Sequence, residues 1–164
     1  MEKKPISNIV KGLIIAAILI VLDLLGATSF LQNVSWFAYV PTIALVVLCA
    51  LNVIHYCSEL KGNVKFGDAF AFGFKTAAIV ALAMVLYTFI SLKYIHPEFK
   101  EKAYQEALTG YQQQPNIMPE EAKTQARNYA DNFIMISVSR ALMSTVIVSA
   151  IGSAIGAALP KRKQ

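Results

Sequence analysis

Residues 13–31 read LIIAAILIVLDLLGATSFL, a run of nineteen residues in which Asp23 is the only formal charge. A helix of about 20 mostly apolar residues crosses the roughly 30 Å of hydrocarbon in a bilayer. Because lipid offers the backbone no hydrogen-bond partners, a segment that crosses it alone is expected to be helical. This run therefore predicts a first membrane span.

Three further stretches, at residues 36–57, 69–92 and 133–159, have the same length and character. The first of these carries no formal charge, the second contains only Lys75, and the third contains only Arg140. The sequence therefore predicts an all-α, integral membrane four-helix bundle in a single membrane domain. Its spans are expected at about 13–31, 36–57, 69–92 and 133–159.

The composition of the whole chain also indicates a membrane protein. Of its 164 residues, 56% are hydrophobic and 15% are charged, and the mean hydropathy is +0.52. Soluble domains have about 25% charged and 45–50% apolar residues. A soluble domain of this size buries only about 70% of the surface of its unfolded chain. The composition argues against a soluble enzyme, a disordered chain and a disulfide scaffold.

Basic residues are distributed unevenly beside the spans. Eight of the fifteen lie in the N-terminal flank, the link between the second and third spans, and the C-terminal tail. The link between the first two spans has none, and six acids offset the five bases of the last link. The positive-inside rule then predicts that both termini face the cytoplasm. The net charge of +5 belongs to that face, so nucleic-acid binding is not expected.

Residues 96–132 form the one long polar segment and are predicted to be an extramembrane helical hairpin. Pro97 and Pro119 suit the first turn of two helices, and the stretch QQQPN at 112–116 ends the first of them. No helix-breaking residue follows before Phe133, so the second helix should continue into the fourth span. The apolar stripe of the hairpin either packs on its own neighbours or binds lipid or a partner.

Two ionisable residues lie at similar depths in different spans. Asp23 is about 12 Å from the outer end of the first span and Arg140 about 10 Å from that of the fourth, at 1.5 Å per residue. Intramembrane charges are costly and usually paired. We predict a buried intramembrane ion pair between Asp23 and Arg140, which either sets helix register or lines a proton or ion route. Lys75 is expected to be an interfacial charge whose stem reaches the cytoplasmic phosphates.

Small residues form stripes on two spans, where close backbone approach favours helix association in lipid. Gly73 and Ala77 belong to the stripe of the third span, and Gly152 and Gly156 form a GxxxG motif in the fourth. These stripes are predicted to pack on each other, with homodimerisation through Gly152 and Gly156 as the alternative. Asn52 is expected to donate an interhelical hydrogen bond.

Signatures of catalysis are missing from the sequence. It contains no zinc-protease, nucleophile-elbow, phosphate-loop or CxxC pattern. The expected topology places His55 and His96 at opposite ends of the membrane, so they cannot share a metal. We therefore expect no enzymatic activity, no catalytic residue, no cofactor and no metal, and no small-molecule substrate is identifiable.

The motifs FGDAF at 66–70, GFKT at 73–76 and YIHPEF at 94–99 resemble those of domain-of-unknown-function family 4199. This family comprises uncharacterised bacterial four-span membrane proteins. The resemblance implies a small multi-pass protein of the bacterial inner (cytoplasmic) membrane, with no assigned activity or site residues.

These observations predict a non-enzymatic accessory or scaffold protein that contacts the lipid bilayer and binds a lipid or a membrane protein partner. The polar insert and the small-residue stripe of the fourth span would be its contact surfaces. The alternative is a small oligomeric transporter or channel that uses Asp23 and Arg140 along a polar route. A wet cavity reaching both residues would favour transport, and a dry, packed pair would favour the accessory role.

Overall fold

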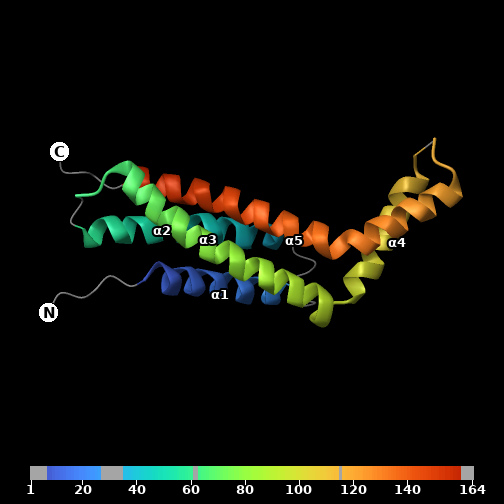
Figure 1. Ribbon diagram of the computed structural model, residues 1–164, viewed down its shortest axis with the longest axis horizontal. Coiled ribbons are helices and arrows are strands. Elements are labelled where there is room, and N and C mark those ends of the chain that lie inside the picture. Colours follow the sequence, from blue (N-terminus) through green and yellow to red (C-terminus); the bar gives the residue numbers. More distant parts are fainter. Residues whose placement is uncertain (1–6, 27–34, 61–62, 115, 160–164) are drawn as a thin grey trace. The chain divides into compact units, whose positions relative to one another are not determined.

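The computed structural model describes residues 7–26, 35–60, 63–114 and 116–159, which form five α-helices and no strand. The helices are α1 (Asn8–Gly26), α2 (Val40–Glu59), α3 (Phe66–Ile90), α4 (Glu98–Gln112) and α5 (Pro119–Ala158). A 3-10 turn (Ser35–Tyr39) precedes α2, and a π-helical segment (Ser91–Ile95) extends α3. The predicted all-α fold is confirmed, since α1, α2, extended α3 and α5 are long and apolar enough to cross a membrane (Figure 1).

Helix ends differ from the limits of the apolar runs. Helix α1 begins five residues before Leu13, where the Ser7 hydroxyl accepts a hydrogen bond from the backbone N–H of Ile9 at 3.3 Å. Pro41 lies in the first turn of α2. Helix α5 runs without interruption for 40 residues, which is the continuous helix that the lack of breakers after Pro119 predicts.

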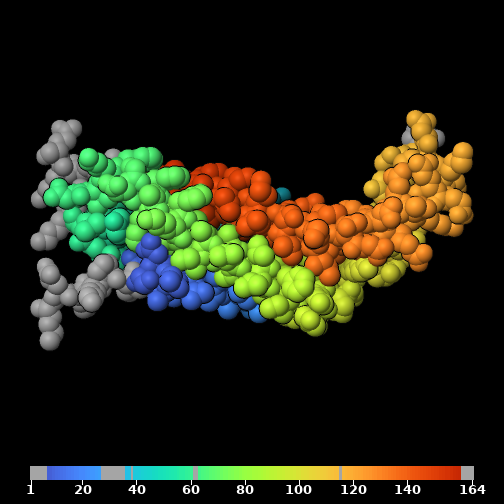
Figure 2. Space-filling view, in the orientation of Figure 1, coloured from blue at the N-terminus to red at the C-terminus, as the bar shows by residue number. Residues whose placement is uncertain are grey.

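The described chain forms two compact units. The first comprises residues 1–84 and 142–164, and the second comprises residues 85–141. In the first unit α1, α2, α3 and the end of α5 lie side by side (Figure 1). The space-filling view shows the α3 surface between those of α1 and α5 (Figure 2).

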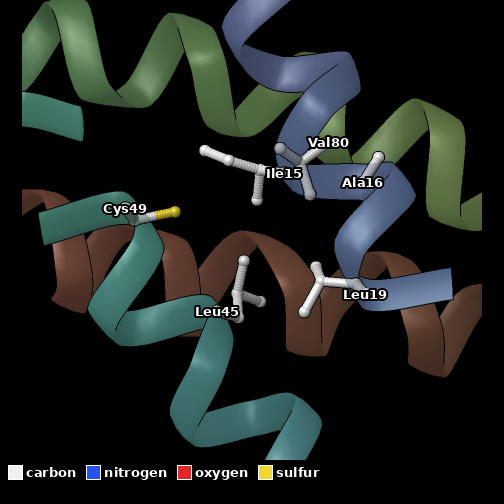
Figure 3. Packing of buried hydrophobic residues seen from close by; sticks show 6 residues of the cluster. All are labelled: Ile15, Ala16, Leu19, Leu45, Cys49 and Val80. Carbon is white, nitrogen blue, oxygen red and sulfur yellow. The ribbon is translucent and has the colours of Figure 1, made fainter. Parts of the chain in front are cut away.

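The core of the first unit joins α1, α2 and α3. Its buried side chains point toward one another from the three helices, as Figure 3 shows; they are Ile15, Ala16, Leu19, Leu45, Cys49 and Val80. A second cluster lies nearer the end of α2 and the start of α3 and includes Val53, Cys57 and Ala69. Cys49 and Cys57 are buried and pack as small apolar residues.

Close helix contacts in the first unit depend on glycine. A Cβ atom added to Gly12 of α1 would lie 2.8 Å from Cβ of Ile79 in α3. One added to Gly73 of α3 would lie 2.6 Å from Oγ of Ser153 in α5. These pairings place the end of α5 beside the start of α3, and the start of α1 beside the middle of α3.

The second unit contains a helical hairpin formed by α4 and the first part of α5. The buried side chains of the hairpin are alanines. In α5 they recur every four residues, at Ala122, Ala126 and Ala130, and in α4 the buried alanine is Ala103. Across the hairpin, Lys100 Nζ donates a 2.9 Å hydrogen bond to Asp131 Oδ1. The small alanine side chains allow the two helices to approach closely.

Candidate functional site

Among the described residues of the first unit, Lys11 has a buried ammonium group. It lies in the first turn of α1, beside Gly12, at which α1 contacts the α3 backbone. Its side chain is only 10% exposed. Burial of a charge is unfavourable unless the charge is paired. The free-energy cost of burying the Lys11 ammonium group therefore depends on the groups around it.

The Lys11 ammonium group has one carboxylate and one aromatic ring near it. Its Nζ atom lies 3.5 Å from Glu59 Oε2 at the end of α2 and 5.2 Å from the centroid of the Phe72 ring in α3. The Phe72 ring in turn stacks on Tyr56 of α2, with centroids 3.8 Å apart. Despite these neighbours, Nζ is buried and has no hydrogen-bond acceptor among the described residues.

Two more polar residues of α2 belong to the same region. His55 Nδ1 lies 3.4 Å from Glu59 Oε1, and the His55 side chain is 62% exposed. Asn52 Nδ2 donates a 3.3 Å hydrogen bond to Thr76 Oγ1 of α3, whose own hydroxyl donates to the Phe72 carbonyl oxygen. The interhelical hydrogen bond predicted for Asn52 is therefore confirmed.

A groove of about 260 Å³ lies between α1 and α2 at these residues. Its polar lining comes from Lys11, Asn52 and His55, and its apolar lining from Ile14, Ile15, Leu48 and Leu51. The arrangement combines a cation and hydrogen-bonding groups with an aliphatic surface. It is suited to an amphiphilic molecule.

Sequence reasoning missed this site because it counted Lys11 only among the basic residues of the N-terminal flank and assigned it no partner. The signal that could have revealed Lys11 is its helical spacing. Residues four apart share a helix face, and Ile15, one turn further on, is buried. Only the pairing of α1 with α2 brings Glu59 to the same place.

The predicted Asp23–Arg140 pair involves two different units. Asp23 lies in the last turn of α1 in the first unit, and Arg140 lies in the part of α5 that belongs to the second. Both side chains are exposed at the surface of the protein. For Asp23 the reason is that the buried positions of α1 end at Leu19. Their pairing remains a prediction.

Lys75 is exposed on α3, while Gly73 and Ala77 on the same helix are buried. Snorkelling of the Lys75 stem toward lipid phosphates remains a prediction. Gly73 contacts α5 through Ser153, which is next to Gly152 in the chain.

The GxxxG motif of α5 packs on a different helix from the one predicted. Cβ atoms added to Gly152 and Gly156 would lie 2.7 Å from the Val46 carbonyl oxygen and 2.5 Å from that of Ala50, both in α2. The stripe prediction must be corrected, because these glycines face α2 rather than α3. Since α2 of the same chain fills this face, the motif is not open to a second copy in this structure.

The hairpin of the second unit has a cleft of about 540 Å³ with charged walls, lined by Pro97, Lys100, Glu101, Tyr104, Arg127, Ala130 and Asp131. At the start of α4, His96 Nδ1 lies 3.0 Å from Glu98 Oε1. Hydrogen bonds from the Glu98 backbone N–H and from His96 lower the pKa of the Glu98 carboxyl. Among the charged residues that line this cleft, Lys100 pairs with Asp131.

Comparison with known proteins identifies the family alone. No curated protein and no solved structure matches the chain. A family model described as "protein of unknown function (DUF4199)" matches residues 10–162, a range that includes both Lys11 and Glu59. The chain therefore belongs to the DUF4199 family of proteins of unknown function, as its FGDAF, GFKT and YIHPEF motifs indicated.

Proposed function

We propose that this chain is a non-enzymatic accessory or scaffold protein of the bacterial inner membrane, which acts by binding a lipid. The observation that carries this proposal is the groove between α1 and α2, which has polar residues at one end and aliphatic residues along the rest. A surface of this kind matches the two parts of a lipid. Its residues contain no arrangement of nucleophile, base and orienting group of the kind that catalysis requires.

The proposal includes an orientation in which both termini lie in the cytoplasm. It rests on the eight basic residues in the flanks and in the link between α2 and α3. In this orientation the polar end of the groove lies at the cytoplasmic leaflet.

A substitution that fills the groove tests the proposal. Leu51 lines the groove and is exposed, whereas Ile43 is exposed on the same helix outside it. We expect the purified wild-type chain and Ile43→Trp to retain one lipid after extensive delipidation, and Leu51→Trp to lose it, as counted by native mass spectrometry. Wild-type protein without retained lipid, or equal retention by Leu51→Trp, would contradict the proposal.

A further inference from the structure

The groove between α1 and α2 has a direction. Because the helices are antiparallel, Lys11 near the start of α1 lies beside the last turns of α2, where His55 is found. Ile14 and Leu48 line the groove further from that end. The polar-to-apolar order along the groove therefore matches that of a lipid in the leaflet at this end, with headgroup outward and acyl chain inward.

The ammonium group of Lys11 lacks acceptors. It has three N–H donors, and its single close carboxylate oxygen, from Glu59, lies 3.5 Å away without a hydrogen bond. A buried donor without an acceptor is unfavourable, more so when it is charged. The lysine stem already lines the groove, and its flexible four-carbon chain can turn the ammonium group toward a ligand there.

The charge of the lining distinguishes between headgroups. Among the described residues that line the groove, Lys11 is the one with a permanent charge, and none is an acid. A phosphate oxygen would supply the acceptor that Lys11 lacks. The amine of a zwitterionic headgroup would find no carboxylate among the described lining residues, and Glu59, next to the groove, already faces Lys11 and His55. An anionic headgroup requires no carboxylate.

We infer that the groove binds an anionic phospholipid, with the phosphate group on Lys11 beside His55 and an acyl chain along Ile14, Leu48 and Leu51. This inference rests on the proposed function and names its ligand. Glu59 competes with the phosphate for the ammonium group and therefore limits the affinity.

The test is a competition between phosphatidylglycerol and phosphatidylethanolamine with identical acyl chains, both supplied in excess to the full chain. Native mass spectrometry reads the ratio of the two lipids bound. We expect the wild type to prefer phosphatidylglycerol about fivefold, the contribution of one lysine near a membrane surface. Lys11→Met should abolish the preference, Lys11→Arg should keep it, and Glu59→Gln should increase it. Lys65→Met, which removes an exposed lysine outside the groove, should leave it unchanged.

Several results would overturn the inference. Equal binding of the two lipids by the wild type would overturn it. This result needs no variant, so it stays decisive even if a variant fails to fold. Equal loss of preference in Lys11→Met and Lys65→Met would show a diffuse charge effect. Stabilisation by inorganic phosphate as strong as that by phosphatidylglycerol would show that the acyl chain is not recognised. If the wild type retains a lipid that Leu51→Trp loses, but shows no headgroup preference, this inference alone is refuted. If the wild type retains no lipid, the proposed function is refuted too.

Discussion

The Lys11 ammonium group lies 3.5 Å from the Glu59 carboxylate and joins the first turn of α1 to the last turn of α2. The Phe72 ring of α3 lies near the same ammonium group. One cation thus connects three helices at one end of the first unit. Buried ion pairs contribute little net stability compared with apolar residues, but breaking one partner is costly.

Removal of Glu59 alone should therefore be more harmful than removal of the pair. We expect Glu59→Gln to lower the free energy of unfolding in lipid-free detergent by about 1–3 kcal/mol, because it leaves a buried ammonium group without a carboxylate. The double variant Lys11→Met/Glu59→Gln should recover part of this loss. Unfolding curves for both single variants and the double variant provide the measurement, and strict additivity would show that the two residues do not interact.

Close packing of α5 on α2 predicts that Gly156 cannot be enlarged. The Cβ of Gly156→Ala would meet the Ala50 carbonyl oxygen at 2.5 Å, and backbone cannot move aside as a flexible side chain can. We expect a loss of about 1–3 kcal/mol in the free energy of unfolding. The control is Gly110→Ala in α4, where the added Cβ would meet no neighbouring atom within 4 Å. It should gain about 0.5–1 kcal/mol from helix propensity, and equal effects at both sites would refute the packing argument.

The alanine seam of the second unit predicts the effect of a larger residue there. Ala126 is fully buried, whereas Asn128 on the same helix is exposed. Ala126→Leu should force α4 away from α5 and reduce the local stability of the hairpin by about 1–3 kcal/mol. Hydrogen exchange of the α4 amides should then accelerate about tenfold or more. The same exchange rates in Asn128→Leu should match those of the wild type.

The lowered pKa of Glu98 predicts a pH dependence at the start of α4. Its carboxylate accepts hydrogen bonds from its own backbone N–H and from His96, so folding favours the charged form. The resulting stabilisation is present above the pKa of the unfolded chain, about 4.3, and is lost as the pH falls through the lowered value. A carboxyl NMR titration should give a midpoint below 4.3 for Glu98. In His96→Ala the midpoint should rise, though not completely, because the backbone N–H remains.

The proposed orientation predicts opposite labelling of the two ends of the chain. The native cysteines are buried, so single cysteines can be introduced at exposed positions without removing them. In intact spheroplasts an impermeant maleimide should label Gln113→Cys, in the link after α4, and should not label Ser58→Cys at the end of α2. Lysis should make Ser58→Cys reactive. Labelling of Ser58→Cys before lysis, with Gln113→Cys protected, would invert the topology.

The sequence by itself determined the fold class and the positions of the helices. Long apolar runs interrupted by one charge at most have no stable alternative to helices in lipid, and Pro41 and Pro119 lie in the first turns of α2 and α5. Local patterns of this kind depend on neighbours in the chain. The FGDAF, GFKT and YIHPEF motifs sufficed to indicate the DUF4199 family.

The tertiary structure decided which faces meet and therefore where the candidate site lies. Small residues permit close approach but do not specify the partner helix, so the GxxxG motif of α5 was predicted to contact α3 and instead contacts α2. Lys11 and Glu59 are 48 positions apart in the chain, and only the antiparallel pairing of α1 and α2 brings them together. The groove exists because of that pairing, since each helix alone presents only one of its walls.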